Sequence, residues 1–168
     1  MTPRDHVDGV LEQWHAERPD LDVSAMGVHG RLTRLVPLLS AQVQQVTRSR
    51  GLGPGEFDVL ASLRRAGPPY RLQPGQLAAA TMVSGAAITS RVDRLVHRGL
   101  VDREVDPSNR RAVLVSLTDA GGALVDDLLE EHVANEERLL AALDPDEREQ
   151  LAGLLRRLLI DRGDTASW

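Results

Sequence analysis

The chain has 168 residues, of which 42% are hydrophobic and 27% charged, the balance of a soluble globular protein. It has no cysteine, which excludes disulfides, thiolate catalysis and cysteine-based oxidation sensing. No apolar run reaches the ~18 residues of a membrane span, and the N-terminal stretch lacks the apolar core of a signal peptide. We therefore expect a cytoplasmic protein without a membrane partner.

The formal net charge of −5 conceals a basic centre, and all 20 basic residues are arginine. Nine arginines and four acidic residues lie between Val59 and Thr118, whereas eleven acidic residues and two arginines lie between Asp119 and Gln150. A basic centre inside an acidic frame suits a surface that binds a polyanion. The alternative is that arginine replaces lysine throughout the chain and clusters partly by chance.

Two helices are predicted in the first third of the chain. An apolar stripe that includes Val7 and Trp14 predicts a helix over residues 4–18, which Pro19 ends. Ser24 is the expected N-cap of a long helix that reaches residue 50. Its apolar stripe is longer than one small domain needs from a single helix, so we expect part of it to face another subunit.

The remaining elements are separated by clear turn signals, "GLGPG" at 51–55 and "GPPY" at 67–70. Two alternating runs flank "DPSNRR" and predict a β-hairpin. The expected helices cover residues 56–66, 75–81, 84–98, 118–143 and 144–160, and the expected strands cover 100–105 and 112–117. The predicted fold is therefore mainly α, with one small hairpin.

A short helix, a three-residue turn, a second helix and a hairpin form the layout of a winged helix-turn-helix. Ile88, Val92 and Leu95 share the core side of the second helix. The opposite side carries small, hydroxyl and arginine side chains, which suit insertion into a DNA major groove. A purely structural amphipathic helix would look similar, and the arginines beside the hairpin turn favour DNA. The expected DNA-binding residues are Ser84, Gly85, Ala86, Thr89, Ser90, Arg94, Arg110 and Arg111.

Two further arginines lie outside this surface, and each has two interpretations. Arg91 lies at the edge of the apolar stripe, where it either faces the groove side of the helix or extends its stem over the core. Arg103 alternates in phase with Val101 and Val105, which predicts that it points inward and needs a buried acceptor. If the hairpin curls at an edge, Arg103 is exposed instead.

The chain resembles the MarR family of bacterial transcription regulators along nearly its whole length. The resemblance is carried by "GEFDVLASLRRA" and by the run from "LQPGQLAAATMVSG" through "LVDREVDPSNRRAVLVSLTDAG". It implies a homodimer that binds a palindromic operator in double-stranded DNA. The implied regions are residues 1–50 for dimerisation and ligand binding, 51–118 for the DNA-binding lobe and 119–168 for dimerisation. Ser108 and Asn109 depart from the family's usual wing pattern.

A narrower resemblance is to the urate-responsive subgroup, which carries an extra N-terminal helix with a tryptophan. It implies a site for a small anion, urate or a related purine, formed by Trp14, Asp58, Arg91 and Arg103. It also implies that Asp58 pairs with Arg103 and that the anion competes for this pair. Taken singly, Trp14 also suits core packing, and Asp58 also suits a solvated helix face.

Three other functions are weighed against this one. A MarR-type regulator could answer a different small anion, such as a phenolic acid or a carboxylate metabolite. An enzyme is not expected, nor a metal or other cofactor, because the five histidines lack the spacing of a catalytic or metal site. The best metal pair, His132 and Glu136, has the spacing of an ordinary solvated helix face. A DNA-free interaction module would show no salt-dependent binding to any duplex.

Overall fold

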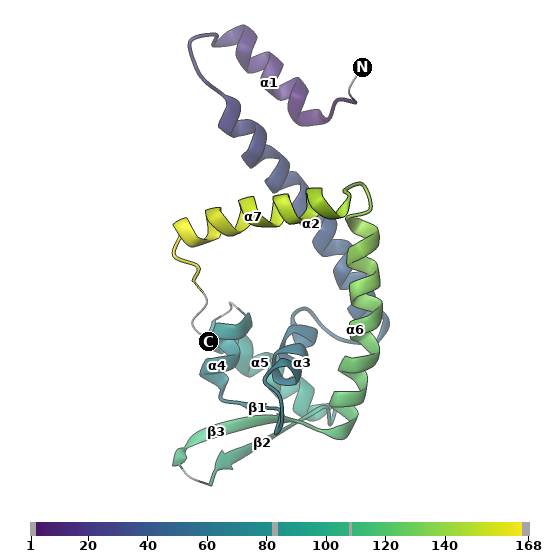
Figure 1. The fold of residues 1–168 in the computed structure, drawn as a ribbon. Coiled ribbons are helices and arrows are strands. Elements are labelled where there is room, and N and C mark those ends of the chain that lie inside the picture. The colour runs from purple at the N-terminus through teal and green to yellow at the C-terminus, as the bar shows by residue number, and fades with distance from the viewer. Residues whose placement is uncertain (1–2, 82–83, 108, 166–168) are drawn as a thin grey trace. The chain divides into compact units, whose positions relative to one another are not determined.

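The computed structural model describes residues 3–81, 84–107 and 109–165, and the side chain of Arg111 lies outside this description. The chain forms two compact units, Met1–Gln45 and Val46–Trp168. Figure 1 shows a mainly helical chain with one small antiparallel sheet, as predicted. The elements are α1 (His6–Glu17), α2 (Ser24–Ser49), α3 (Glu56–Arg65), β1 (Arg71–Leu72), α4 (Pro74–Thr81), α5 (Gly85–His97), β2 (Val101–Asp106), β3 (Asn109–Leu117), α6 (Asp119–Leu139) and α7 (Pro145–Asp161). In the described part of the chain, no helix is long and apolar enough to span a membrane.

In the first unit, α1 is held on α2 by apolar side chains packed on glycines and by a charged cluster. Val7 of α1 is buried, and a Cβ placed on Gly30 of α2 would lie 3.3 Å from it. Arg31 of α2 donates to Asp5 at 2.8 Å and to Asp8 at 2.6 Å. The same two carboxylates form the capping box that begins α1. The attachment of α1 to α2 therefore shares its charged groups with the cap of α1.

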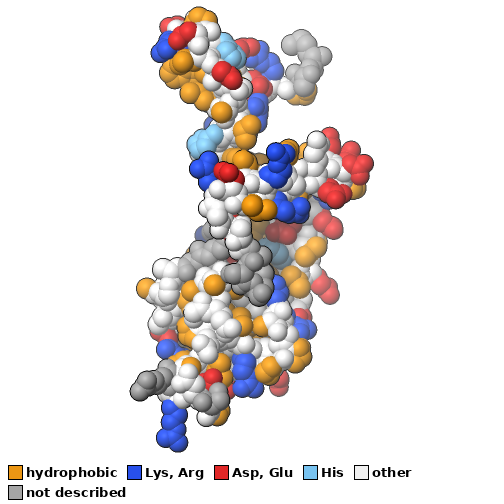
Figure 2. Space-filling model, turned by 60° about the vertical axis from the view of Figure 1, so that its left-hand side comes forward, with side chains coloured by type: hydrophobic (Ala, Val, Ile, Leu, Met, Phe, Trp, Pro, Cys, Tyr) orange, Lys and Arg blue, Asp and Glu red, His pale blue; other side chains and the backbone are white. Residues whose placement is uncertain are grey.

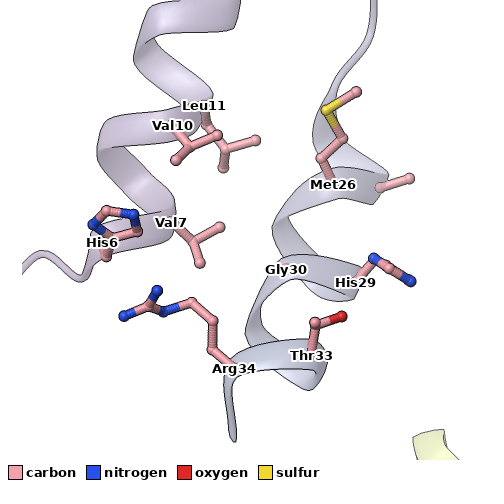
Figure 3. Close-up of a pocket in the computed structure, with 10 residues that line it drawn as sticks. His6, Val7, Val10, Leu11, Met26, His29, Gly30, Thr33 and Arg34 are labelled. Carbon is pink, nitrogen blue, oxygen red and sulfur yellow. The ribbon is translucent and has the colours of Figure 1, made fainter.

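A groove of about 560 Å³ lies between α1 and the first half of α2 (Figure 3). Val7 and Leu11 point from α1 towards α2, and the Arg34 side chain extends from α2 towards the beginning of α1. Trp14 does not line this groove, and its side chain is 43% exposed on α1. The groove is lined by His6, Val7, Val10, Leu11, Ala25, Met26, His29, Gly30, Thr33 and Arg34.

The attachment of α1 is expected to weaken in acid. The hydrogen bond from Arg31 is the main cause that holds the pKa of Asp5 below its ordinary value of 3.8. A carboxyl group whose pKa is lowered by folding stabilises the fold above its unfolded pKa, and this contribution is lost as the pH falls through the folded pKa. The protection of the α1 amides, measured as exchange relative to the intrinsic rate at each pH, should therefore fall below about pH 4 before protection in α5 does. Asp5→Asn should remove this pH dependence, and an unchanged profile in the variant would contradict the assignment.

The second unit has one apolar core, which α3, α4, α5, the sheet and α6 share. Leu60 and Leu63 from α3, Leu77 from α4, Leu95 from α5 and Leu128 from α6 are all fully buried. The strand order is β1-β3-β2, and both pairings are antiparallel. The two-residue strand β1 was not predicted, because two residues are too few for an alternating pattern.

The C-terminal helices begin at well-formed caps. The Thr118 hydroxyl accepts from the Gly121 amide at 3.0 Å and donates to the Gly99 carbonyl at 2.9 Å, which joins the start of α6 to the end of the α5 segment. Asp144 and Glu147 form the capping box of α7. None of the residues of α7 is buried, and its exposed large apolar side chains are Leu151, Leu154, Leu158, Leu159 and Ile160.

Candidate functional site

Helix α5 presents two chemically different sides, as its sequence predicts. Ile88, Val92 and Leu95 are buried against α3, α4 and β2. The N-cap Ser84 accepts from the Ala87 amide at 3.4 Å. All six predicted DNA-binding residues of this segment are exposed: Ser84, Gly85, Ala86, Thr89, Ser90 and Arg94. The exposed side begins with small side chains, so another molecule could approach the α5 backbone closely at this end.

The hairpin β2–β3 supplies the second part of the candidate surface. Strand β3 begins at Asn109, so Arg110 and Arg111 lie inside the strand, whereas the sequence placed them in the loop before it. The register shifts next to the pair Asp106 and Asn109. Arg110 is exposed, while the Arg111 side chain and Ser108 lie outside the described residues. Figure 2 shows arginine side chains (blue) at the bottom of the view, where the hairpin of the second unit lies.

Arg94 of α5 is bound by a buried carboxylate that the sequence analysis missed. Its Nε donates to Glu56 Oε1 at 2.6 Å, and its Nη1 donates to Ser90 Oγ at 2.7 Å. The side chain of Glu56 is only 3% exposed, whereas that of Arg94 is 50% exposed. In the sequence, Glu56 has the appearance of an ordinary acidic residue in the first turn of a helix. No sequence signal distinguishes it from a solvated one.

Arg103 is exposed and pairs with Asp93 of α5 at 3.0 Å, so the inward orientation was wrong and the alternative is correct. Val101 is buried, but Val105 is 57% exposed. The reason is that the two-stranded ribbon leaves the core after its first residue, so alternation no longer separates inside from outside. Asp58, the partner that the resemblance implied, is exposed in the first turn of α3 and has no ion pair with any described residue.

Arg91 lies between the core and the start of α3. A Cβ placed on Gly55 would lie 2.2 Å from the Arg91 Cζ, so the guanidinium packs directly against this glycine. Arg91 Nη1 is buried and has no hydrogen-bond partner among the described residues. Residues 91 and 93 are about 200° apart around an α-helix, so Asp93 and its partner Arg103 lie across α5 from Arg91. The structure therefore does not bring Arg91 and Arg103 together.

Gly55→Ala is expected to lower the free energy of unfolding by about 1–2 kcal/mol, the cost of a side chain in the left-handed region. Gly55 has φ +72°, and the added methyl group would also displace the Arg91 guanidinium. The matched control is Gly75→Ala, since Gly75 lies in α4 with nothing within 4 Å of its Cβ position. Chemical denaturation measures both variants. Equal free energies of unfolding would contradict the close packing of Arg91 on Gly55.

Comparison with known proteins places these features in a family. The MarR family profile matches residues 50–112, from the end of α2 through α5 and into β3. The transcriptional regulator PecS from Dickeya dadantii is 41% identical over 152 residues, which cover 90% of this chain and 92% of PecS. Its name describes it as a helix-turn-helix type regulator.

Two solved structures resemble this chain closely in fold. The first is BpsR from Bordetella bronchiseptica, whose DNA binding is described as regulated by 6-hydroxynicotinic acid. It is 30% identical to this chain, with a TM-score of 0.70, and the match covers 78% of this chain and 91% of BpsR. The second is a MarR variant from E. coli complexed with operator DNA; it is 26% identical, with a TM-score of 0.71 and coverage of 83% and 99%. With its buried α5 core, exposed α5 face and β2–β3 hairpin, this chain belongs to the MarR family of DNA-binding transcription regulators.

Proposed function

We propose that the protein is a homodimeric repressor that binds a palindromic operator in double-stranded DNA and is released by a small planar anion. The first candidate for the anion is urate or a related purine. The main support for DNA binding is the exposed face of α5, whose small and hydroxyl side chains lie opposite a fully buried apolar face.

In the proposed complex, the start of α5 enters the major groove, where Thr89 and Ser90 contact bases or phosphates. Ser84 and Gly85 lie at the positive end of the helix dipole, which favours a phosphate oxygen. Arg110, exposed on the hairpin, is placed to bind the flanking minor groove or backbone, and Arg111 is proposed for the same role. The two half-sites would be about 34 Å apart, one turn of B-DNA, as in other dimeric helix-turn-helix proteins.

The proposed partner in the dimer is a second copy of this chain. Helix α7 has no buried residue, yet half-exposed leucines repeat along it at positions 151, 154 and 158. An apolar stripe of this kind on a well-capped helix is typical of a surface that another chain covers. In the other unit, α2 also carries exposed apolar residues, among them Leu35, Val36 and Leu38, which a second copy could cover.

The proposed ligand contact is Arg91. Its buried Nη1 lacks a hydrogen-bond partner among the described residues, and an unpaired buried guanidinium nitrogen is costly. A carboxylate or urate oxygen would satisfy this donor. Because Arg91 belongs to α5, an anion bound to it would act directly on the helix that is proposed to enter the major groove. Trp14 and Asp58 remain predictions from the resemblance, and Arg103 would enter the site only by leaving Asp93.

A second ligand class has support of its own. BpsR, whose DNA binding is described as regulated by 6-hydroxynicotinic acid, is 30% identical to this chain. An aromatic hydroxy-carboxylate presents the same planar anionic chemistry to Arg91 as urate does. In either case the ligand acts only through its preference for the state that does not bind DNA, and a ~100-fold preference supplies about 2.7 kcal/mol of coupling.

The experiment is an electrophoretic shift assay of the purified dimer on the DNA upstream of its own gene. Urate, 6-hydroxynicotinate and salicylate are titrated separately. We expect one of them to release the DNA at micromolar to millimolar concentration, and Arg91→Ala to abolish the release. Arg156→Ala, an exposed arginine of α7, is the control and should respond like the natural protein. If none of the three compounds releases the DNA, the proposed ligand response is contradicted. If the protein forms no shifted complex at all, the proposed DNA binding is contradicted.

A further inference from the structure

Among the described residues, Glu56 is the buried charged group that the proposed mechanism leaves without a role. It begins α3 directly after the loop "GLGPG", and its side chain is 3% exposed. Its Oε1 accepts from Arg94 Nε at 2.6 Å, and its Oε2 accepts from the Gly53 amide at 2.8 Å. Arg98 Nη1 lies 3.7 Å from Oε2. One carboxylate thus contacts Arg94 of α5, the C-cap Arg98 and the loop before α3.

Arg98 extends this contact to the end of α2. It donates to the Gly51 carbonyl at 2.8 Å and to the Arg50 carbonyl at 3.3 Å. Arg94 and Arg98 are four residues apart, so they lie on one side of α5. Arg98 therefore binds the segment that joins α2 to α3, and Arg94 binds the first residue of α3.

We propose, on the basis of the DNA-binding function above, that Arg94 is a positioning residue whose partner is Glu56. In this assignment Arg94 does not read the operator. The pair Glu56–Arg94 holds α5 at a fixed orientation on the 50–56 segment, and the bases and phosphates are contacted by the first half of α5 and by the hairpin.

The charges and the geometry support this role. Arg94 and Glu56 together carry no net charge, so the pair gives little attraction for a phosphate, whereas Arg110 is exposed and has no ion pair with any described residue. The Arg94 Nε points to Glu56 and its Nη1 to Ser90, so the guanidinium is already held at two points. If the Arg94 Nε turned from Glu56 to DNA, the buried carboxylate would lose its 2.6 Å bond and keep only the Gly53 amide and the more distant Arg98, which is unfavourable.

The two roles predict opposite results for three variants. If Arg94 positions α5, Glu56→Gln weakens operator binding about fivefold or more, the scale of coupling between contacting residues. Arg94→Lys weakens it similarly, because an ammonium cannot reproduce the guanidinium fork. If Arg94 instead contacts phosphate, Glu56→Gln releases it and leaves binding equal or tighter, and Arg94→Lys keeps the affinity.

The test is operator binding by fluorescence anisotropy at several salt concentrations for Glu56→Gln, Arg94→Lys, Arg94→Ala and the double variant Glu56→Gln/Arg94→Ala. Circular dichroism first establishes a temperature at which each variant is folded. We expect the double variant to bind the operator no more weakly than the weaker-binding of Glu56→Gln and Arg94→Ala. We also expect all four variants to keep the salt slope of the natural protein. A salt slope shallower by about 0.9 in Arg94→Ala, the value for one lost phosphate contact, would overturn the proposal.

Two controls separate this proposal from the proposed function. Glu130→Gln changes an exposed acid of α6 and should leave the affinity unchanged. Absence of salt-dependent binding by the natural protein would contradict the DNA-binding function itself. Normal binding by the natural protein together with unaffected Glu56→Gln and Arg94→Lys would contradict the positioning role alone.

Discussion

Gly121→Ala is expected to cost about 3 kcal/mol or more of unfolding free energy, beyond the usual range for overpacking by one methyl group. A Cβ on Gly121 would lie 1.9 Å from the Leu100 carbonyl oxygen and 2.9 Å from the Leu100 carbonyl carbon. These are backbone atoms of the residue before β2, so no side-chain rotation relieves the overlap. Helix α6 would have to move away from the sheet and from the Thr118 cap.

The neighbouring glycine provides the control. Gly122 has nothing within 4 Å of its Cβ position, so Gly122→Ala should raise the free energy of unfolding by about 0.5–1 kcal/mol through helix propensity. Thermal and urea unfolding of both variants would measure the difference. Similar stabilities for the two would mean that α6 does not approach the Leu100 backbone as closely as described.

Leu95→Ala is the second large effect, and we expect a loss of about 2–5 kcal/mol, the range for a buried leucine. Leu95 is fully buried in the core between α3, α4, α5 and the sheet, and its carbonyl accepts from the Leu100 amide at 3.0 Å. The cavity would lie directly beneath α5, the helix proposed to enter the major groove. Operator affinity should therefore fall even at temperatures at which the variant remains folded.

Val96 is the matched control on the same helix, since its side chain is 39% exposed. Val96→Ala should change the free energy of unfolding by no more than about 0.5 kcal/mol, as surface substitutions do. Denaturant unfolding measures the free energy of unfolding of both variants, and the m values of the two should be equal. If Val96→Ala lowered the free energy of unfolding as much as Leu95→Ala, the assignment of Leu95 to the buried side of α5 and Val96 to its exposed side would be contradicted.

The elements with long periodic patterns were predicted well from the sequence. Ile88, Val92 and Leu95 repeat at helical spacing, and because one face of α5 is buried, the pattern alone fixes which side chains point inward. The helix starts at 84, 118 and 144 were predicted for the same kind of local reason, since the side chains of Ser84, Thr118 and Asp144 each accept from an amide three residues ahead.

The charged partners of the candidate site could not be predicted in this way. Arg103 was expected to point inward because Val101 and Val105 alternate with it, but alternation shows burial only where both strands lie on a core. The pairs Arg103–Asp93 and Arg94–Glu56 join residues 10 and 38 positions apart. Their geometry depends on how helices and hairpin pack, which no local spacing contains.

The salt dependence of DNA binding tests the central claim most directly. The dissociation constant for the duplex upstream of the protein's own gene is measured between low and physiological salt for the natural protein, Arg110→Ala and Arg162→Ala. Arg162 follows α7 and its side chain is 84% exposed, so it serves as a charge-matched control. We predict a steep slope for the natural protein, a slope shallower by about 0.9 for Arg110→Ala and no change for Arg162→Ala. A slope near zero, or equal slopes for the two variants, would contradict a DNA-binding winged helix-turn-helix that uses this hairpin.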